Sequence, residues 1–260
     1  MAGNLDIRRL GEKAFWPLFG FLTLIALVPL WSFRVPPMQD IWQHLALVDV
    51  MHNYDAPGSI YPYYFFLPEA PRPNLVYYFV THWLAYLFEL ETANKIVLSG
   101  YIVSFAPAFL YLLRSFGRPR WLVFFAFPFI YNAMFGYGFV SFLLAMPILF
   151  VAIGAYRRFV EPRGCELDLR LGGLVAGLMV LAFFTHAHTY MLICFLAGIL
   201  LLLHREGGWG FVLRAAPFVP ALAFFVPWFI VYFIEGTPSS SGMSFGSFDQ
   251  LFGPTYYRPS

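Results

Sequence analysis

The chain contains the stretch Gly138-Phe-Val-Ser-Phe-Leu-Leu-Ala-Met-Pro-Ile-Leu-Phe-Val-Ala-Ile-Gly-Ala-Tyr156, which carries no charged side chain. Similar apolar runs recur between residues 14 and 235, and each has about the length, roughly 20 residues, that a helix needs to cross a hydrocarbon core of about 30 Å. The candidate runs are 14–33, 74–91, 94–113, 121–134, 138–156, 171–189, 190–203 and 211–234. These runs predict a polytopic membrane protein rather than a soluble domain.

The composition supports the same class. Hydrophobic residues make up 60% of the 260 residues and charged residues only 12%, whereas about 25% of a soluble domain is charged. Lipid offers no hydrogen bonds to a bare backbone, so spanning elements must be helices or a closed barrel, and runs this long without alternation are not barrel strands. We therefore expect an all-α fold, a polytopic bundle of membrane helices.

The distribution of the 16 Lys and Arg residues bears on the number of crossings. With eight crossings and a cytoplasmic N-terminus, most of them would lie outside, against the positive-inside rule. If 74–91 instead lies on the outer face, 12 of the 16 become cytoplasmic. The four that then remain outside are Arg34, Arg72, Lys95 and Arg258. This pattern favours about seven transmembrane helices and an external first loop, 34–93, although 74–91 is long enough to span.

The rest of the chain adds few constraints. Residues 1–235 form the expected transmembrane module, and 236–260 read as the start of an external loop that is cut short. A formal net charge of +2, with basic residues scattered among short loops, gives no reason to expect a nucleic-acid partner. Cys165 and Cys194 differ in setting and indicate neither a disulfide framework nor a metal knuckle.

The external segment after Pro36-Pro37 carries the first candidate site. A helix that starts near Asp40 places Asp40, Gln43 and His44 on one face. Another face, which could rest on the bilayer, carries Ile41, Leu45 and Val48. Asp40 can serve as an N-cap in a capping box with Gln43. Alternatively, its carboxylate acts as a general base toward a hydroxyl or helps to bind a metal.

Other polar residues gather in the remaining outer segments. His186 and His188 lie between apolar runs, where ionisable groups often mark a site, but their hydrogen bonds could simply close a helical hairpin. Asn132 and Tyr137 lie in a glycine-containing turn and could bond a ligand or act as interfacial anchors. Lys95 could meet a lipid phosphate or snorkel to the interface.

The pattern of these segments resembles the GT-C superfamily of membrane glycosyltransferases, which includes protein O-mannosyltransferases and the aminoarabinose transferase of lipid A. The resemblance covers nearly the whole chain as architecture. It rests on Pro-Pro-x-x-Asp40, Ala-Asn-Lys95, the stretch from Tyr131-Asn132 to Gly136-Tyr137-Gly138-Phe139, and Thr-His186-Ala-His188. The last two stretches resemble uncharacterised bacterial members.

The resemblance implies transfer of a sugar from a polyprenyl-phosphate donor in the membrane lipid to an acceptor on the external face of a bacterial inner membrane. Asp40 would be the catalytic base or a metal-associated carboxylate, His44, its nearest polar helical neighbour, would be the second catalytic residue, and Lys95 would lie near the lipid phosphate. Substrate-binding residues would be Asn132, Tyr137, His186 and His188. Many members carry a second acidic residue beside the first, whereas Asp40 is followed by an isoleucine. No metal ligands are assigned, and a divalent metal cofactor stays open.

Two other functions remain possible on the sequence alone. A transporter or channel would use Asp40, His44, His186 and His188 to relay protons or bind a substrate, and it predicts polar groups deep in the membrane. A membrane scaffold without catalytic activity would need none of these residues. The clustering of polar groups near one face favours the enzyme.

Overall fold

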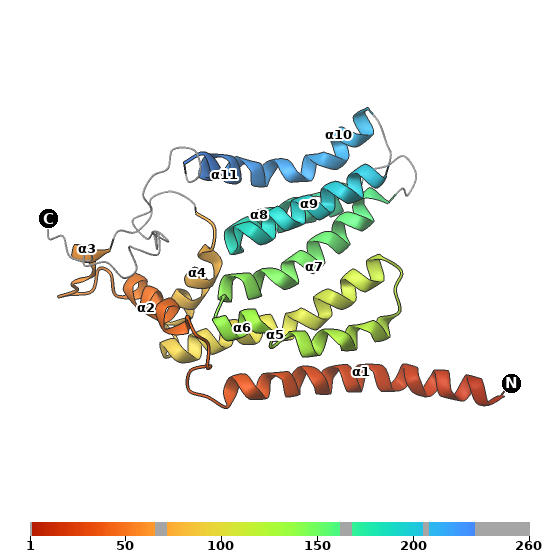
Figure 1. Ribbon diagram of the computed structural model, residues 1–260, viewed down its shortest axis with the longest axis horizontal. Helices are drawn as coiled ribbons and strands as arrows, with labels where there is room; N and C mark the ends of the chain where they lie inside the picture. The colour runs from red at the N-terminus through yellow and green to blue at the C-terminus, as the bar shows by residue number, and fades with distance from the viewer. Residues whose placement is uncertain (1, 66–71, 162–167, 205–207, 232–260) are drawn as a thin grey trace, which may run out of the picture. The chain divides into compact units, whose positions relative to one another are not determined.

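The computed structural model describes residues 2–65, 72–161, 168–204 and 208–231, and none of these residues lies in a strand. In chain order the elements are α1 (Ala2–Trp31), α2 (Ile41–His52), α3 (Tyr61–Tyr64), α4 (Leu75–Leu84), α5 (Leu90–Ser115), the 3-10 helix η1 (Arg120–Phe129), α6 (Ala133–Tyr137), α7 (Val140–Val160), α8 (Leu169–Thr185), α9 (Ala187–Leu203), α10 (Trp209–Ala215), the 3-10 helix η2 (Ala216–Phe218) and α11 (Val219–Phe229) (Figure 1). The all-α prediction is confirmed. The chain divides into a large unit, Met1–Phe224, and a small unit that begins at Phe225.

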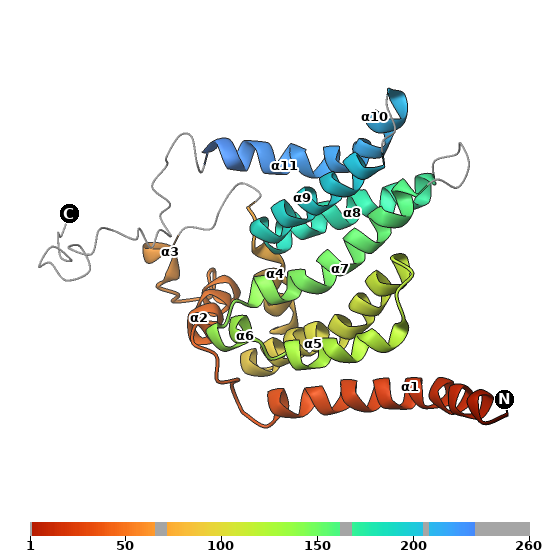
Figure 2. The ribbon, with the colours of Figure 1, turned by 45° about the vertical axis from the view of Figure 1, so that its right-hand side comes forward.

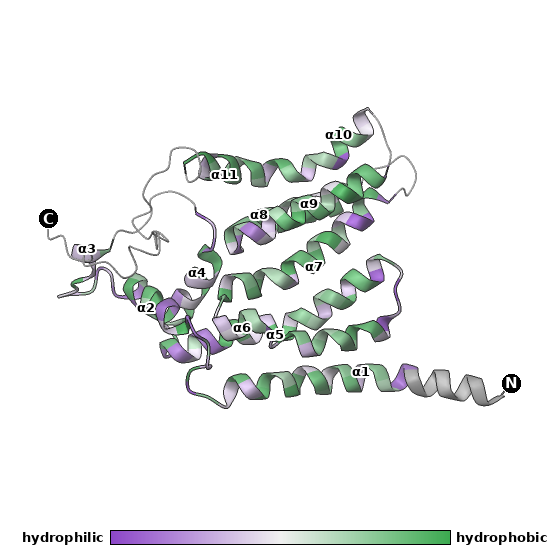
Figure 3. Cartoon of the chain, in the orientation of Figure 1, coloured by the Kyte–Doolittle hydropathy of each residue, from purple (hydrophilic) through white to green (hydrophobic). Residues whose placement is uncertain are grey.

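Within the described ranges, four helical segments are long and apolar enough to cross a membrane. They are Glu12–Trp31, Leu90–Ser115, Val140–Val160 and Trp209–Phe229. Figure 3 shows α5 and α7 green along most of their length, with purple residues near their ends. The helices α8 and α9 are also apolar but shorter. These features indicate a membrane protein, and the seven crossings stay a prediction.

The centre of the large unit is the packing of α5 against α7. Other helices pack against these two: α1 and η1 contact α5, and α8 and α9 contact α7. Figure 2 shows these neighbours after a turn of 45°. Gly154 of α7 permits the close approach, because a Cβ atom at this position would lie 2.9 Å from the Tyr111 ring of α5. Small residues have this role at many helix interfaces in membranes.

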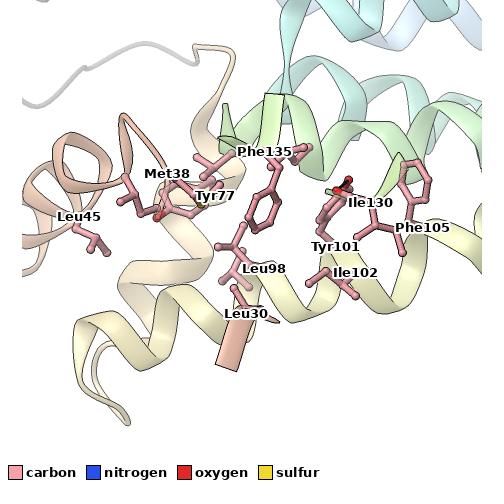
Figure 4. Close-up of a cluster of buried hydrophobic side chains, with 14 of the residues drawn as sticks. Leu30, Met38, Leu45, Tyr77, Leu98, Tyr101, Ile102, Phe105, Ile130 and Phe135 are labelled. Atoms are coloured by element: carbon pink, nitrogen blue, oxygen red, sulfur yellow. Dashed lines mark hydrogen bonds between the residues drawn. The ribbon is translucent and has the colours of Figure 1, made fainter. Parts of the chain in front are cut away.

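The apolar face of α2 packs inside the protein. Ile41 and Val48 are fully buried, and Leu45 is 4% exposed. All three belong to a core cluster that includes Tyr77 of α4 and Leu98 of α5 (Figure 4). The expectation that this face rests on the bilayer is wrong, because α4 and α5 cover it.

The segment 74–91 forms only a short helix. Its helical part, α4, has 10 residues and is followed by turns and a bend before α5 begins at Leu90. At 1.5 Å per residue α4 is about 15 Å long, roughly half of a hydrocarbon core. α4 contacts α2, α5, α7 and α8, so it is part of the packed bundle. It is not among the helices long enough to cross a membrane.

The apolar run 121–134 is broken rather than continuous. Its first part is η1, which contains Pro128, a residue without a main-chain N–H to donate. The ring of Phe124 in η1 lies 5.4 Å from that of Phe15 in α1. The chain then turns and forms the five-residue α6. The end of α6 contacts the first residues of α2, where the candidate site lies.

Candidate functional site

The first residues of α2 are fixed against the turn that joins α6 to α7. The main-chain N–H of Gln39 donates to the Gly136 carbonyl (2.9 Å), and that of Asp40 donates to the Tyr137 carbonyl (3.1 Å). Gly138 has φ +86°, and a Cβ atom there would lie 3.0 Å from the Asp40 nitrogen. The backbone of Asp40 is therefore held in place by a segment almost 100 residues away in the chain.

Asp40 occupies the N-cap position of α2, but its side chain makes no capping hydrogen bond among the described residues. The capping-box expectation for Asp40 and Gln43 is thus wrong in this respect. The backbone of Asp40 has φ −95° and ψ 4°, outside the extended region that N-cap residues usually adopt. The half-buried carboxylate does not accept a hydrogen bond from the free N–H groups at the start of α2. It is available for another partner.

His44 lies one helical turn after Asp40 and is held from two sides. Its Nδ1 atom lies 2.6 Å from the Tyr78 hydroxyl of α4. Burial lowers the pKa of His44, while the Asp40 carboxylate and a hydrogen bond to the Gly138 main chain act in the opposite direction. Because burial is the largest of these effects, the imidazole is kept neutral near pH 7.

Tyr78 is the residue of this site that the sequence analysis missed. Burial raises the pKa of Tyr78 to about 12, so its hydroxyl stays protonated and can donate to His44. The adjacent Tyr77 donates to the Asn94 amide oxygen of α5 (2.8 Å). The pair of tyrosines therefore links α2 to α4 and α4 to α5. The signal for Tyr78 in the sequence was its spacing of four residues from His82, which places the two on one helical face.

A second aromatic and histidine cluster lies further along the same two helices. The ring of His52 in α2 lies 5.4 Å from that of His82 in α4. Tyr86 packs on both rings, with centroids 4.5 Å from His52 and 5.1 Å from His82. Burial lowers the pKa of His82, and the neighbouring His52 acts in the same direction. This cluster extends the contact between α2 and α4 beyond His44.

Lys95, in the first turns of α5, lies next to the end of α1. Its ammonium group is 4.8 Å from the centre of the Trp31 ring at the end of α1. An ion pair between Arg34 and Glu91 (3.0 Å) joins the same ends of the two helices. Among the described residues, neither a hydrogen bond nor an ion pair joins Lys95 to Asp40. The structure therefore groups Lys95 with α1, at the exposed end of the helix pair.

The Asn132 side chain and the Tyr137 carbonyl form hydrogen bonds that hold the turn together. The Asn132 side chain accepts from the Phe135 N–H (3.1 Å) and donates to the Phe129 carbonyl (2.9 Å). It thereby caps α6. The Tyr137 side chain is 49% exposed, and its contribution to the site is the carbonyl that accepts from Asp40.

His186 and His188 lie at the break between α8 and α9. The His186 Nδ1 atom accepts from the Thr189 N–H (3.2 Å) and caps α9, as expected for a residue that closes a helical hairpin. The rings of His186 and His188 are 5.5 Å apart, and His188 is exposed. The ring of Phe142 in α7 lies 5.6 Å from His186. Phe142 follows the Gly138 turn by four residues, so α7 connects the histidines to the Asp40 site.

Taken together, α2 supplies a carboxylate that makes no capping bond and a neutral imidazole, and α4 supplies a phenol. Such a set can accept and pass on a proton. Across the described part of the chain, no group of three or more His, Cys, Asp or Glu side chains is arranged to hold a metal ion. No protein-family model, no curated protein and no solved structure matches this chain.

Proposed function

We propose that this protein is a membrane glycosyltransferase that moves a sugar from a polyprenyl-phosphate donor to an acceptor hydroxyl on the external face of the membrane. The observation that carries the proposal is the state of Asp40. Its backbone is fixed by the turn before α7, while its carboxylate is free of the helix end and one turn from His44. A carboxylate held in this way suits a general base.

The proposed topology has seven crossings with the N-terminus in the cytoplasm. The short length of α4 supports the placement of 74–91 on the outer face, because a ten-residue helix is too short to cross the hydrocarbon core. The α2 and α4 helices lie at one end of α5 and α7 (Figures 1 and 2). The other end of these helices carries Arg114, Arg118, Arg157 and Arg158, as the positive-inside rule requires of the cytoplasmic side.

In the proposed reaction the acceptor oxygen attacks the anomeric carbon of the donor sugar. The bond from that carbon to the phosphate oxygen breaks, and its electron pair leaves with the polyprenyl phosphate. The acceptor hydroxyl loses its proton to Asp40, and His44 can relay that proton onward. Tyr78 fixes the orientation of the His44 ring against α4. Only one carboxylate is needed in this direction of chemistry.

Lys95 has a separate role in the proposal. Its position over Trp31, beside the Arg34–Glu91 ion pair, puts an ammonium group at the outer ends of α1 and α5. An ammonium group at a membrane surface attracts lipid phosphates. We assign Lys95 to the capture of the donor phosphate rather than to the proton transfer.

The first experiment is a transfer assay in proteoliposomes. The purified chain is offered a panel of polyprenyl phosphates that carry radiolabelled sugars, and label is followed into lipid and protein acceptors. Transfer from one donor that depends on the protein supports the glycosyltransferase. No transfer from any donor would contradict it and favour the transporter or the scaffold.

A labelling experiment tests the orientation. Single cysteines replace Asp55 or Arg118 in a background of Cys165→Ser and Cys194→Ser. A membrane-impermeant thiol reagent added to intact cells should label the cysteine at position 55 and leave the one at position 118 unlabelled. The reverse pattern would contradict the proposed orientation.

A further inference from the structure

A cavity of about 460 Å³ lies among α5, η1, α6 and α7, and its lining includes none of Asp40, His44, Tyr78 and Lys95. Six phenylalanine rings, two methionines, Ala126 and Asn132 line it. Its size falls in the range of about 300–1,000 Å³ that is typical of ligand pockets. An empty space of this size would leave its lining without contacts on one side, which is unfavourable.

The lining selects a hydrocarbon ligand. Among the described side chains that line it, Asn132 alone carries an amide, and both ends of that amide already bond to the protein, with the Phe135 N–H and the Phe129 carbonyl. A polar ligand would lose its hydrogen bonds to water and find no replacement here, at a cost of a few kcal/mol for each buried group. Water itself is excluded for the same reason, since apolar cavities stay dry.

The cavity is reached from the flank of the helix bundle. Two of its lining side chains on η1, Phe125 and Phe129, are 72% and 63% exposed. The neighbouring α5 and α7 are long and apolar enough to cross a membrane, so this flank faces lipid when the protein is embedded. The molecules that meet this opening at the highest concentration are the lipids of the bilayer, which favours them by mass action.

The volume fits one chain of ordinary length. At about 30 Å³ for a water-sized group, 460 Å³ holds on the order of fifteen methylene-sized groups. That is close to one acyl chain of a phospholipid, whereas a long polyprenyl chain would mostly remain outside. We propose that this cavity is a binding site for one acyl chain of a bilayer phospholipid, which completes the packing of η1 against α5 and α7.

Cavity-filling variants test the proposal. Met146→Trp places a larger side chain in the cavity, and Ala126→Leu is a smaller change for the same purpose. Leu192→Trp is the matched control, because Leu192 is 43% exposed on the unrelated helix α9. The full-length protein is purified in mild detergent, and the phospholipid that stays bound is counted by native mass spectrometry.

The native chain and Leu192→Trp should each keep one phospholipid. A cavity-filling variant that remains folded should lose most of the bound phospholipid, because the added side chain occupies the space of the acyl chain. Crosslinks from a phosphatidylcholine with a diazirine in its acyl chain should fall on η1 and α7 and decrease in the same variant. Equal retention in all folded variants would overturn the proposal.

A competition arm separates the two kinds of lipid chain. A polyprenyl phosphate is added to the native chain at the same concentration as the phospholipid. If the native chain retains the phospholipid, the acyl-chain site is supported. If the polyprenyl phosphate displaces the phospholipid, the proposed acyl-chain site is overturned. Neither outcome depends on glycosyl transfer, so the two proposals fail independently.

Discussion

The Nδ1 atom of His44 and the hydroxyl of Tyr78 lie 2.6 Å apart and join α2 to α4. The two residues are 34 positions apart in the sequence. The bond orients the imidazole that follows Asp40 by one turn, and the tautomer of His44 decides which of the two groups donates.

Removal of the Tyr78 hydroxyl tests this relationship. Tyr78→Phe keeps the ring but leaves the buried Nδ1 of His44 without its partner. We expect a loss of about 1–3 kcal/mol in the free energy of unfolding, seen as a lower thermal midpoint in detergent. Tyr86→Phe is the control, because Tyr86 is 60% exposed and should have little effect. Equal midpoints for the two variants would show that the bond does not form.

Acidification should destabilise the contact between α2 and α4. Burial lowers the pKa of His44 in the folded protein, so the unfolded chain binds its proton first as the pH falls below about 6.5. Stability attributable to His44 is therefore complete above about pH 6.5 and decreases toward the lowered pKa of the folded state. The thermal midpoint of the native chain should fall more between pH 7 and 5 than that of His44→Gln. A parallel fall in both would assign the pH dependence to other groups.

Gly138 is predicted to be intolerant of a side chain. Alanine at φ +86° costs roughly 1–2 kcal/mol, and its Cβ atom would also press on the Asp40 nitrogen at 3.0 Å. Gly136→Ala is a matched control two residues away, with nothing within 4 Å of the added atom. Gly138→Ala should lower the thermal midpoint, and Gly136→Ala should not. The opposite order would contradict the described turn.

A similar pair of variants tests the contact between α5 and α7. A Cβ atom at Gly154 would lie 2.9 Å from two atoms of the Tyr111 ring, whereas nothing lies within 4 Å at Gly177 of α8. Gly177→Ala should be neutral or stabilising by up to about 1 kcal/mol, because alanine favours the helix. Gly154→Ala should instead be destabilising by about 1–3 kcal/mol, as expected for overpacking. Thermal unfolding of the two variants side by side would decide, and a stable Gly154→Ala would argue against this helix contact.

Much of the fold could be predicted from the sequence, because apolar runs and prolines act locally. The helix after Asp40 and the break at His186 are examples, and both follow from neighbours in the chain. The cover over Ile41 and Val48 could not be predicted in this way, since it comes from α4 and α5. Periodicity shows that a helix face is apolar but does not tell protein from lipid as its partner.

The candidate site, too, could be predicted from the sequence only in part. Asp40 and His44 were predicted as neighbours because they are four positions apart on a helix. Tyr78 was missed because its contact with His44 depends on how two helices pack, and the free state of the Asp40 carboxylate depends on backbone angles that the turn before α7 imposes. Lys95 was predicted from its charge alone, and its stacking on Trp31 required the structure.

The most direct test of the central claim compares Asp40→Asn with Asp55→Asn in the proteoliposome transfer assay. Asp55 is an exposed carboxylate of the same external segment and serves as the control. If Asp40 is the general base, Asp40→Asn should reduce the rate of sugar transfer by about 10²–10⁴-fold, while Asp55→Asn retains the native rate and both proteins stay folded. Transfer at the native rate by folded Asp40→Asn would contradict the claim.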